Sequence, residues 1–249
     1  MNPILAGPQG IHCGSLILVN AQHPVQLQTA ERCVPLPGSG VLLQQRAAAV
    51  LQHMLVSLGC TSQIVPVSGY RRLAEQQQIW DDAMREHGEA FTRQYVALPG
   101  YSEHQTGLAI DLGLNQGEID FIRPAFPYEG ICQRFREAAP QYGFVERYPA
   151  GKESVTGIAH ECWHFRYVGA PHAQIMARRG MVLEEYIEFL KRFPQDGPHL
   201  TEACGRHPFE IYYLPAEKAG RHRLPDSSLY EISGNNVDGY IVTLWRQPA

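Results

Sequence analysis

The segment His160–Val168 constrains the fold of this 249-residue chain most strongly. It reads His-Glu-Cys-Trp-His-Phe-Arg-Tyr-Val and so contains the pattern H-E-x-x-H, in which two histidines one helical turn apart bind zinc. The aromatic and β-branched residues that fill its second half favour a strand instead. A strand would not turn His160 and His164 toward one metal ion as the helix of a zinc protease does, so the motif alone leaves a structural histidine open.

A second segment, Ser102–Asp111, changes this interpretation. Its polar start passes through a glycine into an apolar strand, so a loop histidine, His104, and a strand aspartate, Asp111, can converge on one ion. Zinc accepts imidazole nitrogen and carboxylate oxygen, and a catalytic site needs three protein ligands and one water. With His164 the set has three members, and Glu161 is then free to act as the base that takes a proton from water.

The spacing of Glu161 and His164 creates a geometric difficulty. Residues three apart on a regular strand point to opposite faces. The backbone between them must therefore turn or bulge, or Glu161 must lie in the loop before the strand. The sequence leaves these alternatives open.

The segment Ser68–Arg72 lies where a strand gives way to a helix. An arginine at this point, Arg71, can face a substrate carbonyl and stabilise the oxyanion of a tetrahedral intermediate. Taken alone the signal is weak, because adjacent arginines are usually solvated surface charges. We expect Arg72 to be solvated in this way.

Composition narrows the class of protein. Hydrophobic residues at 44% and charged residues at 18% are typical of a globular chain. The net charge of −4 and the absence of a basic run argue against nucleic acid or an anionic membrane surface as partner. The start Met1–Ala6 lacks the features of a secretory signal, and the six cysteines are scattered without a C-x-x-C pair. We therefore expect a cytoplasmic protein with reduced thiols and no zinc site made of cysteines alone.

Periodicity and turn signals predict an α+β fold. An N-terminal arm is expected over 1–38, with a short strand or anchored stretch at 15–19. Helices are expected over 41–58, 73–87, 131–139, 171–179 and 183–193, and strands over 64–67, 107–114 and 160–168. Because composition changes near 194–207, we predict a zinc domain over 1–194 and a small C-terminal β appendage over 195–249, with a turn at Gly234–Asn236.

Three spaced segments together resemble the zinc D,D-peptidases, a family that includes the VanX dipeptidases and VanY carboxypeptidases. The family pattern of S-G-Y-R, S-x-H-x-x-G-x-A-x-D and E-x-W-H is present here as Ser68–Arg71, Ser102–Asp111 and Glu161–His164. The likeness is strongest to the bifunctional VanXY-type enzymes. It extends to Tyr95–Pro99, Asp120–Pro124, Trp163–Gly169 and Ile232–Asn236.

The resemblance implies a small antiparallel sheet that carries the zinc site and is flanked by helices. It implies the ligand set His104, Asp111 and His164. Glu161 would be the general base and Arg71 the group facing the oxyanion. Further positions are expected to shape the substrate pocket: Ser102, Tyr70, Gln76 and Trp163. Trp163 is expected to pack against its neighbours or to form a pocket wall.

The implied reaction is hydrolysis of the D-Ala-D-Ala dipeptide, of the C-terminal D-Ala of peptidoglycan pentapeptide precursors, or of both. Vancomycin resistance follows by family analogy, and a housekeeping role in wall recycling would give the same sequence. The implied partner is thus a small peptide, and the sequence does not predict the oligomeric state.

One departure from the family pattern and two alternative functions remain. Cys162 stands where relatives often carry proline; we expect a buried thiol that points away from the metal, with a fourth ligand as the alternative. The zinc scaffold also resembles the signalling domain of hedgehog proteins, so a non-catalytic binding module is one alternative function. A helical zinc endopeptidase that uses His160 as a ligand is the other.

Overall fold

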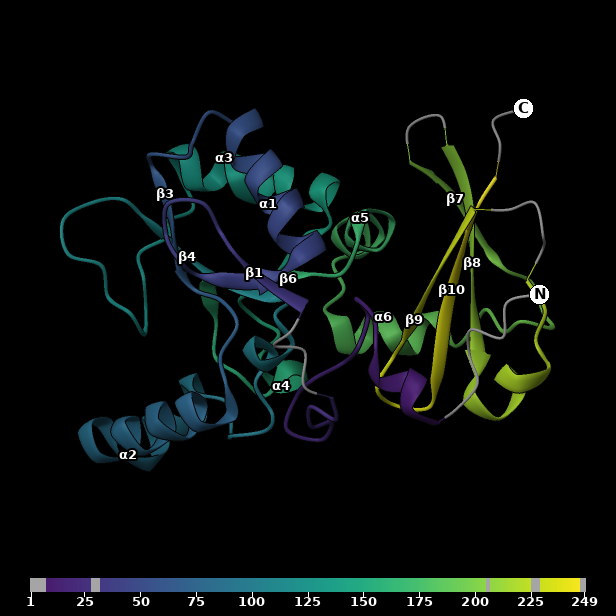
Figure 1. Ribbon diagram of the computed structural model, residues 1–249, viewed down its shortest axis with the longest axis horizontal. Helices are drawn as coiled ribbons and strands as arrows, with labels where there is room; N and C mark the ends of the chain where they lie inside the picture. The colour runs from purple at the N-terminus through teal and green to yellow at the C-terminus, as the bar shows by residue number, and fades with distance from the viewer. Residues whose placement is uncertain (1–7, 28–31, 205–206, 225–228, 247–249) are drawn as a thin grey trace. The chain divides into compact units, whose positions relative to one another are not determined.

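The computed structural model describes residues 8–27, 32–204, 207–224 and 229–246. The start Met1–Ala6, on which the expectation about a secretory signal depends, lies outside them. The chain divides into two compact units, one formed by Val19–Val182 and the other by Met1–Leu18 together with Leu183–Ala249 (Figure 1). The proposed boundary between residues 194 and 195 stays a prediction. Across the described residues, no helix combines the length and the apolar character that crossing a membrane requires.

The unit Val19–Val182 is built on a four-stranded sheet with the order β3-β4-β6-β5, in which all neighbours are antiparallel. The strands are β3 (Ile64–Ser68), β4 (Ala109–Leu114), β5 (Phe144–Tyr148) and β6 (Glu161–Tyr167). The three predicted strands are confirmed, and the strand that contains a proline, β3, lies at an edge as its sequence indicates. β4 and β6 are central and adjacent, and their register puts Asp111 directly opposite His164.

A shift of register between β5 and β6 settles the spacing difficulty. Between two paired positions β5 advances from Glu146 to Tyr148, whereas β6 advances over twice as many residues, from Phe165 to Glu161. The extra residues of β6 form a bulge, which re-aims side chains that a regular strand would alternate. Glu161, the first residue of the strand, thereby comes to the same side as His164.

The described residues of this unit form five α-helices: α1 (Gln45–Ser57), α2 (Leu73–Tyr95), α3 (Gly130–Ala138), α4 (Glu153–Thr156) and α5 (Ala170–Arg179). In Figure 1, α1 and α3 lie above the strands and α2 and α4 below them. The prediction for α2 ended at His87, but the helix resumes beyond Gly88, whose φ of 80° makes a kink that a glycine adopts without strain.

The start of α1 predicted at residue 41 is wrong, because a short strand precedes the helix. Residues Leu42–Gln44 form β2, which pairs with β1 (Cys33–Pro35) in a two-stranded sheet, and the helix begins only at Gln45. Leu43 is fully buried in this strand. Its apolar side chain therefore fitted the helical period by coincidence, because one buried residue satisfies either pattern.

The core of this unit lies on the side of β6 opposite the polar residues. Phe165 packs edge to face against Phe126 and Phe135, with ring centroids 5.4 Å and 5.1 Å apart. Each such burial contributes about 1.5–3 kcal/mol relative to exposure. Because neighbouring side chains on a strand alternate, the same packing turns His164 to the other face. The hydrophobic core thus fixes the strand that carries a site residue.

The second unit contains α6 (Leu183–Leu190) and a four-stranded antiparallel sheet of order β7-β8-β10-β9. Its strands are β7 (Leu200–Cys204), β8 (His207–Pro215), β9 (Leu229–Gly234) and β10 (Gly239–Trp245). The predicted β appendage is confirmed, and so is its turn, where Asn236 takes a positive φ of 60°. Within the same unit, the Leu16 amide donates to Ser233 Oγ (2.8 Å), and residues 15–18 of the predicted anchored stretch are buried without forming a strand.

Candidate active site

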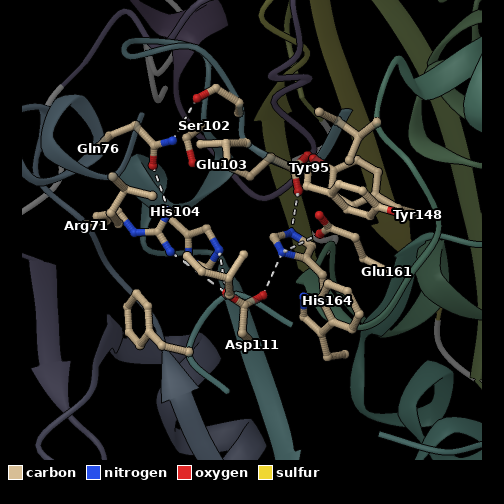
Figure 2. A pocket seen from close by; sticks show the side chains of 17 residues that line it. Arg71, Gln76, Tyr95, Ser102, Glu103, His104, Asp111, Tyr148, Glu161 and His164 are labelled. Carbon is tan, nitrogen blue, oxygen red and sulfur yellow. Dashed lines mark hydrogen bonds and ion pairs between the residues drawn. The ribbon is translucent and has the colours of Figure 1, made fainter. Parts of the chain in front are cut away.

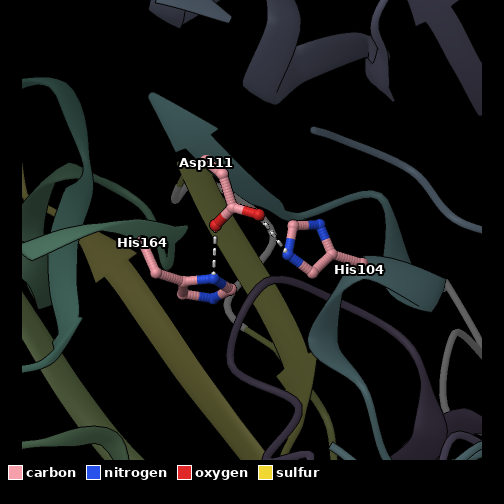
Figure 3. Close-up of side chains that lie close together, drawn as sticks. All are labelled: His104, Asp111 and His164. Carbon is pink, nitrogen blue, oxygen red and sulfur yellow. Dashed lines mark hydrogen bonds and ion pairs between the residues drawn. The ribbon is translucent and has the colours of Figure 1, made fainter. Parts of the chain in front are cut away.

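Three buried side chains form the centre of the candidate site. They are His104, Asp111 and His164, and one ligand atom from each lies within 4.8 Å of the other two (Figure 3). Asp111 comes from β4 and His164 from β6, while His104 belongs to the 3-10 helix Glu103–Thr106 that precedes β4. The sequence therefore identified a cluster that the sheet brings together from three segments.

A backbone carbonyl orients His104. Its Nδ1 lies 2.7 Å from the oxygen of Gly69, and because a carbonyl only accepts, this nitrogen carries the hydrogen. The other nitrogen, Nε2, is left with its lone pair, 3.1 Å from Asp111 Oδ2. A side chain at position 69 would meet the carbonyl oxygen of Leu42 at 2.2 Å, so glycine is required for this close approach.

His164 presents its ring in the opposite sense. Its Nδ1 faces the cluster, 2.9 Å from Asp111 Oδ1, and its Nε2 faces Glu103 Oε2 at 3.6 Å. The atoms available to bind a metal ion are thus Nε2 of His104, Nδ1 of His164 and the carboxylate oxygens of Asp111. Two imidazole nitrogens and one carboxylate oxygen fit a metal site that keeps one position open for water or substrate.

Glu161 lies beside this cluster. Its Oε2 is 3.8 Å from His164 Nδ1, and the residue is only 6% exposed. Burial raises the pKa of Glu161 to about 8 in the metal-free protein. A cation held by the neighbouring ligands would lower this pKa again, since opposite charge favours the ionised carboxylate. The residue is therefore suited to exchange a proton near neutral pH.

Arg71 is held by a network of polar side chains (Figure 2). It donates through Nη1 to Gln76 Oε1 at 2.7 Å and through Nη2 to Ser68 Oγ at 2.8 Å, and Nη2 is 3.9 Å from Asp111 Oδ2. Gln76 in turn donates to the carbonyl of Ala97 at 2.7 Å. Gln76, expected to contact substrate, thus holds the arginine with its amide oxygen and is itself anchored to the backbone through its amide nitrogen.

A pocket of about 520 Å³ opens over these groups. The three clustered residues line it together with Glu161 and Arg71, and so do three of the predicted substrate positions: Ser102, Gln76 and Trp163. Tyr70, the fourth, is not among the described residues that line this pocket; its amide donates to the carbonyl of Leu42.

Sequence reasoning missed the residues behind the cluster. Glu103 is fully buried and pairs with Arg147 and Arg166, which are fully buried as well. Burial opposes ionisation, but the two guanidinium groups outweigh it and hold the pKa of Glu103 well below its usual range. The sequence did offer a signal: Arg147 and Arg166 lie in strands β5 and β6, whose other residues are largely buried. A buried arginine requires an anionic partner.

The helical zinc protease reading is wrong. Glu161–Tyr167 is a strand, and the His160 side chain is 33% exposed, with Nε2 2.6 Å from the hydroxyl of Tyr128. Cys162 is half-buried and does not belong to the three-residue cluster in the described part of the chain. Its carbonyl accepts a bond from Arg136 Nη2 at 3.0 Å, which ties down the backbone beside Glu161.

Comparisons with known proteins show what this chain is similar to. A family model described as VanY, D-alanyl-D-alanine carboxypeptidase, matches residues 40–170. The chain is 42% identical over 180 residues to the bifunctional D-Ala-D-Ala dipeptidase and D-Ala-D-Ala carboxypeptidase VanXYC of Enterococcus gallinarum, covering 71% of this chain and 95% of that protein.

Two solved structures are also similar. The vancomycin resistance D,D-dipeptidase VanXYg, in complex with a D-Ala-D-Ala phosphinate analog, is 48% identical with a TM-score of 0.89 and 96% of each chain covered. A mutant of the D,D-pentapeptidase VanY from a VanB-type resistance cassette, in complex with Zn(II), is 31% identical with a TM-score of 0.58, covering 70% of this chain and 98% of that one.

Proposed function

The chain belongs to the VanY family of D-alanyl-D-alanine carboxypeptidases, and we propose that it is a zinc peptidase that hydrolyses both the D-Ala-D-Ala dipeptide and the terminal D-Ala of pentapeptide precursors. The observation that carries the proposal is the convergence of two imidazoles and a carboxylate beside a buried glutamate and an arginine in one pocket. A binding module has no need of the last two together.

The metal is expected to be zinc, held by His104, Asp111 and His164. When bound, zinc supplies a Lewis acid that lowers the pKa of water and polarises the scissile carbonyl. The buried position of the three donors supports this assignment, because a divalent cation offsets the cost of burying the carboxylate.

The chain's own residues divide the remaining chemistry between them. Glu161 takes the proton of the attacking water and returns it to the leaving amine, which breaks the peptide bond by direct hydrolysis. Arg71, held rigid by Ser68 and Gln76, presents positive charge where the carbonyl oxygen becomes an oxyanion. This mechanism forms no covalent acyl-enzyme, so β-lactams should not inactivate the protein.

The surroundings of the pocket support a substrate longer than a dipeptide. A second pocket, of about 570 Å³, shares Val96, Ala97, Tyr148 and Ile158 with the first. We propose a cytoplasmic role, where the dipeptide and the nucleotide-linked precursor occur together, and the removal of these termini would give vancomycin resistance.

The test is D-alanine release by the purified zinc-loaded protein from D-Ala-D-Ala and from UDP-MurNAc-pentapeptide in parallel. Release from both substrates is expected, with Glu161→Ala inactive although it retains zinc. Release from only one would reduce the proposal to a dipeptidase or a carboxypeptidase. No release from either, with zinc bound, would favour the non-catalytic binding module.

A further inference from the structure

A fully buried ion cluster lies directly behind the candidate metal site. Glu103 Oε1 accepts from Arg147 Nε on β5 and lies 2.8 Å from Arg166 Nη1 on β6. None of the three side chains has any exposed surface. Burying charges of this kind costs several kcal/mol for each ion and is often no more stable than apolar packing. The retention of such a cluster beside a functional site therefore calls for a functional explanation.

The two oxygens of Glu103 face different partners. Both arginines contact Oε1, whereas Oε2 faces the ring of His164 and lies 3.6 Å from Nε2. Within the described residues, neither Oε2 nor Nε2 has a hydrogen-bond partner, and both atoms are buried. An unpaired buried polar atom costs about 1–3 kcal/mol, so these two atoms are each other's partners after a small approach.

The charge on Glu103 fixes the direction of this contact. Two guanidinium groups keep the carboxylate ionised, and an ionised carboxylate only accepts hydrogen bonds. Nε2 of His164 must then carry the hydrogen, which leaves the lone pair on Nδ1. Nδ1 is the nitrogen that faces Asp111 in the cluster.

We propose that Glu103 is a positioning residue for the metal centre: it accepts the Nε2 hydrogen of His164 and so makes Nδ1 the metal-binding atom. Arg147 and Arg166 anchor its far oxygen, which keeps the near oxygen aimed at the ring. This inference deepens the proposed function and rests on the metal site it assigns. Carboxylates that accept from a ligating histidine orient the ring and raise its basicity, and their loss weakens metal binding about 10- to 100-fold.

The test is the zinc affinity of the purified full-length protein, measured by competition with a chromogenic chelator. The Glu103→Gln variant keeps the size of the side chain but removes its charge and fixed acceptor role, and zinc binding should weaken about 10- to 100-fold. Arg147→Met is a graded companion, because it removes one of the two anchors of Oε1, keeps Arg166 and leaves Oε2 opposite His164. It should lower the thermal stability of the metal-free protein at least as much as Glu103→Gln, and weaken zinc binding clearly less than Glu103→Gln does.

A spectroscopic measurement on the unmodified protein covers the case in which a variant does not fold. Long-range ¹H–¹⁵N spectra of the histidine-labelled, zinc-loaded protein should show hydrogen on Nε2 of His164 and on Nδ1 of His104. The Nε2 hydrogen of His164 should also exchange slowly with water, since it is buried against a carboxylate. A hydrogen on Nδ1 of His164, or rapid exchange at Nε2, would overturn the inference.

The outcomes separate this inference from the proposed function. Failure of the unmodified protein to bind zinc would overturn both. Equal zinc affinity for the unmodified protein and Glu103→Gln would overturn only the role of Glu103. A loss in Arg147→Met as large as that in Glu103→Gln would show that the cluster acts through general stability, which also rejects the positioning role.

Discussion

The two four-stranded antiparallel sheets of this protein differ in regularity and in what they bury. The sheet β7-β8-β10-β9 pairs without any shift of register, and its core cluster is apolar and aromatic: Tyr212, Leu214, Ala219, Tyr240, Val242 and Leu244. The sheet β3-β4-β6-β5 has two register shifts and buries Asp111, Glu161, Arg147 and Arg166.

From this difference we expect stability and function to depend mainly on different sheets. Regular pairing over an apolar cluster gains hydrophobic free energy and leaves few polar groups to satisfy. The interrupted sheet carries buried charges, which cost free energy unless each finds a partner or an ion. Its bulge also breaks the alternation of side chains, and that break is what places Glu161 beside His164. Substitutions in the regular sheet should therefore lower the free energy of unfolding, whereas substitutions at the buried polar residues of the interrupted sheet should lower zinc binding or catalysis.

The largest expected effect comes from removing a candidate metal ligand. Asp111→Ala should abolish zinc binding and lower kcat/KM at least about 1,000-fold, because the metal supplies several kcal/mol of transition-state stabilisation. Zinc content measured by mass spectrometry of the purified variant, alongside D-alanine release, checks both statements. Full zinc content in this variant would remove Asp111 from the ligand set.

Removing the base should separate chemistry from metal binding. Glu161→Gln should retain zinc and lower kcat about 100- to 10,000-fold, which is the usual contribution of a positioned general base. Zinc content and kcat are measured on the same sample. Near-normal turnover would mean that another group takes the proton and that the bulge in β6 does not serve catalysis.

Arg71→Met tests the oxyanion role with a side chain of similar length. The loss in kcat should be about 100- to 1,000-fold, the range found when a donor to an oxyanion is removed. Gln76→Ala is a graded companion, since it leaves the guanidinium present but frees one of its two held ends. A smaller fall in kcat for Gln76→Ala than for Arg71→Met is expected, and the reverse order would contradict the assignment of Gln76 as a support.

The regular sheet should respond in stability alone. Leu214 is fully buried in its apolar cluster, so Leu214→Ala should cost about 2–5 kcal/mol of unfolding free energy. Zinc content and kcat/KM per folded molecule should stay unchanged below the melting temperature. Loss of zinc in this variant would contradict the expectation that the regular sheet contributes to stability and not to metal binding.

The smallest effect concerns pH. Burial lowers the pKa of His172 in α5 to about 3, whereas an unfolded histidine titrates near 6.5. Above about pH 6.5 both states are neutral; below it only the unfolded state gains the proton, so stability falls by up to about 1.4 kcal/mol per pH unit. Urea unfolding of the chelated protein at pH 7 and pH 5 should show a smaller loss for His172→Gln. Equal losses in the two proteins would assign acid sensitivity to other groups.

Much of the fold followed from local patterns. Most of the predicted helices and strands lie within a few residues of the observed ones, and the errors of boundary fell where a short strand or a glycine kink adjoined a helix, at Leu42–Gln44 and Gly88. The elements β5 and α4 were not predicted. Local propensity cannot distinguish these cases, because a single buried leucine fits either period and glycine tolerates a kink inside a helix.

The sequence by itself determined which reactive groups are available, namely the identities and order of His104, Asp111, Glu161 and His164. It also favoured a strand over a helix for the segment that carries Glu161 and His164, and the structure then excluded the helical zinc motif. Only the tertiary structure decided which ring nitrogen each histidine presents and that Gln76 supports Arg71. It also revealed the buried ion cluster of Glu103 behind the site. The physical reason is that residue types and spacings are local, whereas hydrogen-bond partners, register shifts and desolvation depend on segments that only packing brings together.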